Sequence, residues 1–172
     1  NDGTIKLDTG VLASSIGKDG EGSENGSIIV QGTVTNTVNG EQAKQIHQNA
    51  LTINSGAELI VNANDLDIQN GSATIQNGGK ITFKGTGTLQ EKLAGEGTMN
   101  VEAGAKITVP AANLGNQIRN RGTLIFTQDH EILNQIVTSD LTNSEVGYLE
   151  IATGASLQVA NATTANISTQ NV

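Results

Sequence analysis

Apolar and polar residues alternate along most of the chain in short runs, and glycine-containing turns separate the runs. In one copy, apolar residues at Ile53, Leu59 and Val61 lie on either side of a turn at Gly56. The same arrangement recurs at 75–83, 101–109 and 151–159. Alternation with a period of two is typical of strands that bury one face, and a slip of one residue would turn the apolar side chains outward. The pattern therefore predicts pairs of short strands joined by tight turns.

The strand pairs recur at two nearly fixed spacings. Similar units begin at Gly97, Gly122 and Gly147, so successive units are equally spaced (122 − 97 = 147 − 122 = 25). An earlier series steps by 22 residues and pairs Ile46 with Ile68, Ile53 with Ile75, Leu59 with Ile81 and Val61 with Phe83. Repeats of about 20–50 residues mark solenoids, whose units bury their apolar faces against their neighbours. We therefore expect Met99, Leu124 and Leu149 to stack in one column, and the later coils to carry longer turns.

A third short strand completes each repeat. Apolar residues upstream of the glycine units recur at the same spacing as those units, Leu89 with Leu114 and Leu93 with Ile118 (114 − 89 = 118 − 93 = 25). Three short strands per turn of 22–25 residues predict an all-β fold, a right-handed parallel β-helix of about seven coils. Left-handed hexapeptide helices have a tighter period of about 18 residues, which disfavours that form.

The chain is expected to form one solenoid segment over residues 1–172. Residues 1–45 are less regular, residues 46–159 are regular, and residues 160–172 form either a fading coil or a tail. Neither end shows an obvious cap, and an uncapped solenoid exposes a strand edge. We therefore expect the chain to be a piece of a longer surface protein.

Composition supports a thin core and limits the partners. Hydrophobic residues make up 35% of the chain, and the aromatic residues are Phe83, Phe126 and Tyr148. The net charge is −8 with nine Lys and Arg residues, so no basic stripe is available to neutralise phosphates and nucleic-acid binding is not expected. Cysteine is absent, which excludes disulfides and thiolate chemistry in this chain.

One acidic loop is the candidate binding element. Asp19, Glu21 and Glu24 lie among glycines in residues 17–26, a stretch without periodic apolar residues. The acids do not have the spacing of an EF-hand calcium loop. We therefore expect a solvated loop, and neither a metal site nor a cofactor.

Other chemistry-bearing residues give no catalytic pattern. Right-handed β-helices host polysaccharide lyases and glycosidases that gather two or three acids on one face. The positions one later repeat beyond Glu102, Asp129 and Glu131 hold no further acid. His47 and His130 lie several coils apart and are expected to be surface histidines. The expectation is a non-enzyme, with a carbohydrate-active β-helix enzyme or a phage-fibre-like polysaccharide-binding protein as the alternative.

The segments 118–126 and 147–155 resemble the repeats of bacterial autotransporter passenger domains. Those repeats run apolar-x-Asn-x-Gly-x-Leu, followed by a Gly-Ala turn and a second strand, as Ile118, Asn120, Gly122 and Leu124 do here. The resemblance covers about residues 51–159, and filamentous haemagglutinins and surface-layer proteins carry similar patterns. The chain has no Gly-Asp-Ser-Gly motif, so the protease branch of the family is not implied.

The resemblance implies a secreted, extracellular β-helix adhesin at the bacterial cell surface, with a role in virulence. Such a module would act as a stalk in cell adhesion, presenting loops to host or neighbouring-cell surface molecules or to itself. Attachment to the outer membrane would use parts that this chain does not contain.

Overall fold

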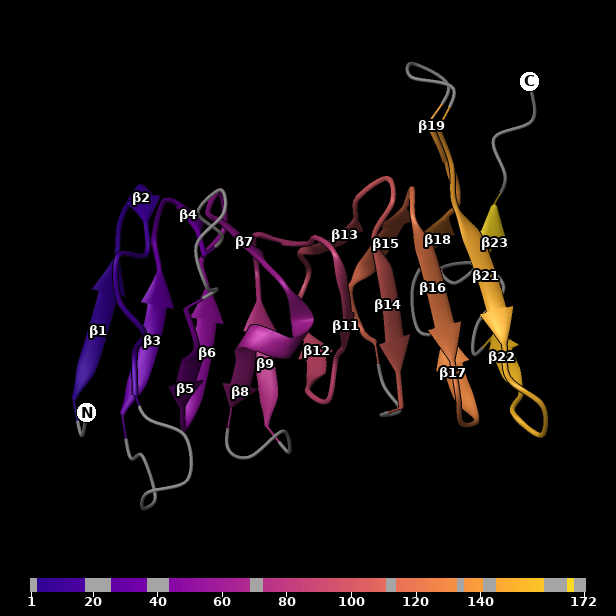
Figure 1. Ribbon diagram of the computed structural model, residues 1–172, viewed down its shortest axis with the longest axis horizontal. Helices are drawn as coiled ribbons and strands as arrows, with labels where there is room; N and C mark the ends of the chain where they lie inside the picture. The colour runs from indigo at the N-terminus through magenta and orange to yellow at the C-terminus, as the bar shows by residue number, and fades with distance from the viewer. Residues whose placement is uncertain are drawn as a thin grey trace.

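The chain winds into a right-handed parallel β-helix (Figure 1). The computed structural model describes residues 3–17, 26–36, 44–68, 73–110, 114–132, 135–140, 145–159 and 167–168. Within these ranges every strand pair is parallel except one short antiparallel pair, so the fold class predicted from the alternation is confirmed.

Three larger sheets run along the solenoid. The first contains β1 (Thr4–Leu7), β3 (Ser27–Val30), β6 (Ala50–Ile53), β9 (Thr74–Asn77) and β12 (Lys92–Ala94). The second contains β2 (Gly10–Val11), β4 (Thr33–Thr35), β7 (Glu58–Val61), β10 (Lys80–Phe83), β13 (Thr98–Val101), β15 (Gln117–Asn120), β18 (Ile136–Val137) and β23 (Ile167–Ser168). The third contains β11 (Thr86–Thr88), β14 (Lys106–Val109), β16 (Thr123–Phe126) and β21 (Tyr148–Ile151).

Three smaller pairs complete the described secondary structure. They are β5 (Ile46–Gln48) with β8 (Leu66–Ile68), β17 (His130–Ile132) with β22 (Leu157–Val159), and the antiparallel β19 (Ser139–Asp140) with β20 (Glu145–Val146). A single 3-10 turn, η1 (Ala63–Asp65), precedes β8. No helix in the described part of the chain is long and apolar enough to cross a membrane.

The coil count differs slightly from the prediction of about seven. Five consecutive turns carry three strands each: β3–β4–β5, β6–β7–β8, β9–β10–β11, β12–β13–β14 and β15–β16–β17. The turn before them contributes only β1 and β2. The turn after them is interrupted by the antiparallel pair. The first and last turns therefore do not repeat the regular three-strand coil.

The core is a thin column of stacked aliphatic side chains. In the second sheet the inward residues of successive turns pair directly and are almost fully buried. They are Val34, Leu59, Ile81, Met99, Ile118 and Ile136. Phe83 and Phe126 are the largest buried side chains. The low aromatic content therefore matches a core that is filled mostly by aliphatic side chains.

The 22-residue series is confirmed in the second sheet but not everywhere. Leu59 pairs with Ile81 and Val61 pairs with Phe83, as predicted. Ile53 instead pairs with Asn77, and Ile68 pairs with Gln48. The repeat is therefore not uniform from one sheet to the next.

The predicted column of Met99, Leu124 and Leu149 is wrong at its first member. Leu124 pairs with Leu149, but its other neighbour is Ile107, while Met99 pairs with Ile118. Each glycine unit marks a strand that begins after a corner of the solenoid. Because every turn has several corners, similar glycine units can begin strands of different sheets. The unit at Gly97 opens a strand of the second sheet, whereas those at Gly122 and Gly147 open strands of the third.

Coil length does not rise along the chain as predicted: the middle coils are shorter than the first, and the step from Leu124 to Leu149 in the third sheet is long again (149 − 124 = 25). The step from Val34 to its partner Leu59 is long (59 − 34 = 25), but those from Ile81 to Met99 and from Met99 to Ile118 are shorter (99 − 81 = 18, 118 − 99 = 19). The early turn adds η1 and β8 after β7, whereas only residues 89–91 separate β11 from β12.

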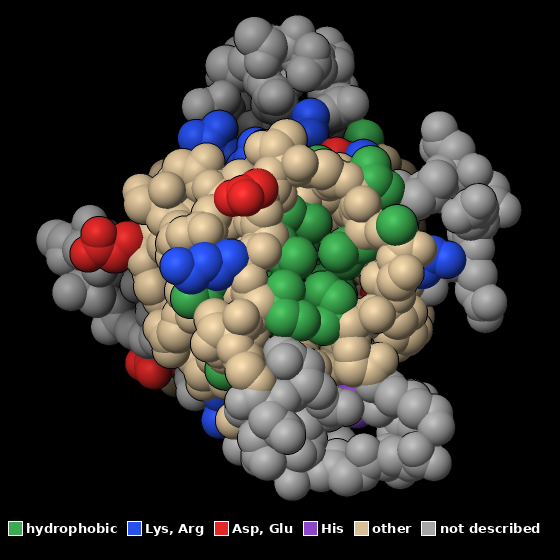
Figure 2. Space-filling model, turned by 90° about the vertical axis from the view of Figure 1, so that its left-hand side faces the viewer, with side chains coloured by type: hydrophobic (Ala, Val, Ile, Leu, Met, Phe, Trp, Pro, Cys, Tyr) green, Lys and Arg blue, Asp and Glu red, His purple; other side chains and the backbone are tan. Residues whose placement is uncertain are grey.

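The N-terminal end of the core is open in the described part of the chain. β1 and β2 each pair on one side only, with β3 and β4. Figure 2 looks onto this end and shows apolar side chains at the centre of a ring of polar atoms and backbone. Val11 in β2 is 58% exposed.

Candidate functional site

A shallow groove crosses the third sheet on its outer surface. Its main wall is a ladder of four side chains that occupy the first position of successive strands and pair directly with one another. They are Thr86, Lys106, Thr123 and Tyr148. The residues that follow Lys106, Thr123 and Tyr148 along their strands are Ile107, Leu124 and Leu149, which face the core. Because strand side chains alternate between faces, the ladder side chains point outward.

Residues with small or no side chains form the base of the groove. Ala103, Gly104 and Ala105 form the turn between β13 and β14, and Gly122 lies one turn above them. A Cβ atom at Gly122 would lie 2.3 Å from the carbonyl oxygen of Ala105, so only glycine fits there. The groove has a volume of about 540 Å³.

Backbone contacts hold Tyr148 at the end of the groove. Its N–H donates to the carbonyl oxygen of Gly122 at 2.8 Å, and its own carbonyl accepts from Asn120 Nδ2 at 2.9 Å. Asn120 Oδ1 accepts from the Gly122 N–H at 3.1 Å, so one amide ties both strands. The Tyr148 side chain is 66% exposed. A fixed backbone therefore presents a large aromatic ring to solvent.

Two cationic residues line the groove of this acidic protein. Lys106 and Arg121 line it, and none of its described lining residues carries a carboxylate. The nearby Glu102 is directed to Lys84, with Oε2 3.6 Å from Nζ. Arg121 already has an interaction partner, so its charge is not counted as open to a ligand.

Sequence reasoning did not find this groove. The steps along its ladder all differ in length (106 − 86 = 20, 123 − 106 = 17, 148 − 123 = 25), so no single period aligns its members. Each strand of this sheet begins with a polar residue or Tyr148, and this was the signal available in the sequence. The sequence alone does not show which of these strands belong to the same sheet, because the positions of the corners between sheets are not evident from it. The predicted binding loop with Asp19, Glu21 and Glu24 lies outside the described residues.

Two of the three acids weighed as catalytic candidates, Asp129 and Glu102, make structural contacts. Asp129 Oδ1 accepts from both the N–H and the Oγ of Ser156 at 2.8 Å, which joins β17 to the turn before β22. Glu102 is directed to Lys84 as described. Among the residues with assigned positions, no three His, Asp or Glu side chains converge as metal ligands.

His47 is buried, which corrects its prediction as a surface histidine. It pairs with Asp67 on the next turn, and its Nδ1 lies 3.0 Å from Asp67 Oδ2. Glu91, one turn further, is 1% exposed, and its Oε1 accepts from the N–H of Ile68 at 3.1 Å. Burial raises the pKa of the Glu91 carboxyl, and the charge of Asp67 raises it further, while the Ile68 N–H opposes both effects. His47 and Asp67 therefore form a direct pair, and Glu91 lies near enough to Asp67 to feel its charge.

Replacing Glu91 with Gln is expected to stabilise the protein at neutral pH. Glu91 Oε2 has no hydrogen-bond partner among the described residues, and the raised pKa means that the folded state disfavours the charged form. This cost appears as pH rises above the ordinary Glu pKa of about 4.3, so Glu91→Gln should gain about 1–2 kcal/mol at pH 7 and nothing near pH 3. Urea unfolding at both pH values measures the difference. An equal gain at both would contradict the charge-burial explanation.

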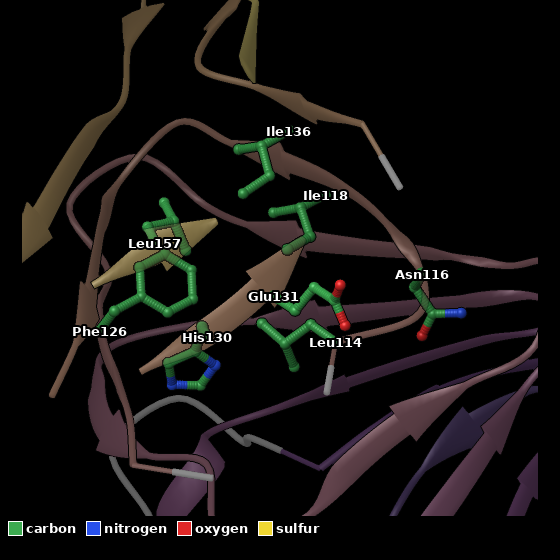
Figure 3. Close-up of a pocket in the computed structure, with 8 residues that line it drawn as sticks. All are labelled: Leu114, Asn116, Ile118, Phe126, His130, Glu131, Ile136 and Leu157. Atoms are coloured by element: carbon green, nitrogen blue, oxygen red, sulfur yellow. The ribbon is translucent and has the colours of Figure 1, made fainter. Parts of the chain in front are cut away.

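His130 is also buried, at the edge of a small cavity (Figure 3). Its Nε2 lies 3.1 Å from the carbonyl oxygen of Val109, and its ring meets Phe126 edge-on at 4.8 Å between centroids. The cavity offers about 10 Å³ for the centre of a water molecule, which is room for one water. His130 occupies the position opposite Leu157 on the next turn, so it is a core residue rather than a surface histidine.

Protonation of His130 is expected to weaken the fold at mildly acidic pH. Burial lowers the pKa of His130, although the Val109 carbonyl and Asp129 oppose the shift. Near pH 6.5 His130 then binds a proton in the unfolded chain but not in the folded chain. The free energy of unfolding therefore falls as the pH drops below that value. From pH 7 to pH 5 the contribution of His130 to this loss should be about 1 kcal/mol.

His130→Leu should remove that loss. Leucine suits an apolar position opposite Leu157 and cannot be protonated. Because Glu91 has the opposite pH sign, the informative quantity is the wild-type minus variant unfolding free energy across pH 7 to 5. A difference that stays constant over this range would refute the assignment.

Comparisons with known proteins add no relative. No protein-family model, curated protein or solved structure matches this chain.

Proposed function

We propose that this chain is a non-catalytic structural and adhesive module of a secreted bacterial surface protein. Its β-helix would serve as a rigid stalk that presents groups on its outer surface for attachment. The observation that carries the proposal is the continuous inward column of the second sheet, which runs in register from Val34 to Ile136. A core shared by successive turns in this way resists bending and leaves the outward positions available for binding.

The outer surface supports attachment more than catalysis. The groove of the third sheet presents Lys106 and the exposed ring of Tyr148, which are groups suited to binding. The acids Glu102 and Asp129 are engaged in structural contacts. As an extracellular module it would meet surface molecules of a host or a neighbouring cell, or a second copy of itself. The same groove favours polysaccharide binding as the second candidate function.

The test is adhesion of protein-coated beads to cells under flow. Beads carrying the folded protein should remain on epithelial monolayers or on bacterial lawns. Beads carrying equal amounts of Leu124→Asp protein, which is expected to be unfolded, should wash off. Equal retention of the two, or no retention of either, would overturn the proposal. Release of reducing ends from a panel of polysaccharides by the purified protein would overturn its non-catalytic part.

A further inference from the structure

We propose that the groove of the third sheet binds an extended, uncharged saccharide chain. Tyr148 would provide a stacking surface for one sugar ring, and the hydroxyl groups of Thr86 and Thr123 would contact the hydroxyl groups of the rings beside it. This inference rests on the proposed attachment function and names the ligand class of that module.

The exposed aromatic ring is the most specific feature of the groove. Tyr148 exposes 66% of its surface, although hydrogen bonds to Gly122 and Asn120 fix its backbone. In the described part of the chain, the other large hydrophobic residues that are exposed are Val11 and Ile151. The face of an aromatic ring packs against the apolar face of a pyranose. Because the backbone of Tyr148 is already held in place, little conformational freedom is lost when a sugar stacks on its ring.

The hydroxyl groups of the ladder provide the polar contacts. Thr86 and Thr123 pair with Lys106 from either side, and the three side chains point outward. A threonine hydroxyl can both donate and accept a hydrogen bond, as a sugar hydroxyl does. Lys106 adds N–H donors between the two threonines. The lining therefore suits a ligand that carries many hydroxyl groups.

The shape of the groove fits a short extended oligosaccharide. The four ladder residues lie on consecutive strands, which are about 4.8 Å apart. The ladder therefore spans about 14 Å, or three strand spacings, which is longer than a single sugar ring. The base of Ala103, Gly104, Ala105 and Gly122 lets a flat ring approach the backbone closely.

The charges around the groove favour an uncharged ligand. Arg121 already has an interaction partner and is given no role here. Glu150 is exposed, and it lies two residues after Tyr148 on the same outward face of β21. An acidic saccharide stacked on Tyr148 would lie near this carboxylate, and the net charge of −8 would repel it at longer range. An uncharged saccharide meets neither cost.

An extended peptide fits the groove less well than a saccharide. Such a peptide usually binds along a free strand edge through backbone hydrogen bonds. This groove runs across β14, β16 and β21, and the backbone groups between these strands already pair with one another. The contacts that remain come from side chains, and these are hydroxyl groups, one ammonium group and one ring.

Tyr148 offers a direct measurement, because it is the only Tyr and the chain has no Trp. The probes are cellohexaose, mannohexaose and xylohexaose, three neutral hexasaccharides with extended β-linked chains. At least one of them should change the tyrosine emission saturably, and its affinity should differ less than about twofold between low and high salt, since no charge pair forms. The absence of a saturable change with all three would overturn the proposal. A galacturonate hexasaccharide that bound more tightly than all three would overturn the assignment to an uncharged ligand.

Matched variants locate the site by calorimetric titration with the hexasaccharide that binds best. Tyr148→Ala should weaken binding by about tenfold, whereas Tyr148→Phe keeps the ring and should stay within about twofold of the wild type. Thr123→Val removes one hydroxyl group at nearly constant shape and should weaken binding by about fivefold. Thr74→Val makes the same change at an exposed position of the first sheet and should have less than about a twofold effect.

Unchanged binding in Tyr148→Ala, or equal weakening by Thr123→Val and Thr74→Val, would overturn the proposal. Circular dichroism of each variant checks that it is folded. Failure here is separable from failure of the attachment function. If wild-type beads adhere to cells and the Tyr148→Ala beads adhere equally well, the groove is not the attachment site and this inference fails alone. If wild-type beads do not adhere, the proposed function fails whatever the groove binds.

Discussion

Leu124→Asp is expected to abolish cooperative unfolding. Leu124 is fully buried in β16, between Ile107 on one turn and Leu149 on the next. The substitution removes an apolar side chain and places a carboxylate between the aliphatic side chains of Ile107 and Leu149. The combined cost should be about 5 kcal/mol or more, which is comparable to the whole stability of a typical domain.

The measurement is urea unfolding followed by far-UV circular dichroism. The wild type should show one sigmoidal transition, and Leu124→Asp should show none. Gln76→Asp is the control, because Gln76 in β9 is exposed and the same side chain there should cost about 1 kcal/mol or less. A wild-type transition in Leu124→Asp would disprove the stacking of β14, β16 and β21.

Gly79→Ala should destabilise the protein by about 3 kcal/mol through one added methyl group. A Cβ atom at Gly79 would lie 2.3 Å from the carbonyl oxygens of both Ala57 and Asn54 on the turn below. The Ala57 oxygen cannot move away easily, because it accepts from the N–H of Lys80 at 2.9 Å. The added atom must therefore push two turns of the solenoid apart.

Gly78→Ala is the matched control for this prediction. At the neighbouring position a Cβ atom would meet the Ile53 carbonyl oxygen at 3.4 Å, which is an ordinary contact. Thermal unfolding of the two variants should show a large drop in Tm for Gly79→Ala and a small change for Gly78→Ala. Equal changes would mean that general glycine effects, rather than the close approach of two turns, control stability here.

The alternation of residues predicted the strands well because it reports a local property. Leu59, Ile81 and their neighbours are apolar at every second position because one face of each strand is buried, whichever sheet it belongs to. The sheet membership depends on the number of residues at each corner, which varies from turn to turn. Matching Gly97 to Gly122 therefore compared a strand of the second sheet with one of the third.

The candidate site was harder to predict for the same reason. Tyr148 and Lys106 come together only because β14, β16 and β21 are consecutive strands of one sheet. His130 follows an acidic residue in a turn-like sequence, so its burial opposite Leu157 was not evident. In both cases the function of the residue depends on which residue pairs with it on the next turn.

The register of the second sheet also has a consequence for how the chain folds. Its paired inward residues between Val34 and Ile136 are separated along the chain by only about 0.10–0.15 of its length. That range is typical of mixed α/β domains that fold faster than sandwiches and barrels with distant pairings. Each turn needs only the turn before it as a template, so folding can start at any formed turn and advance one coil at a time. A chain that is made from its N-terminus onward could then build its solenoid as it emerges, without waiting for its far end.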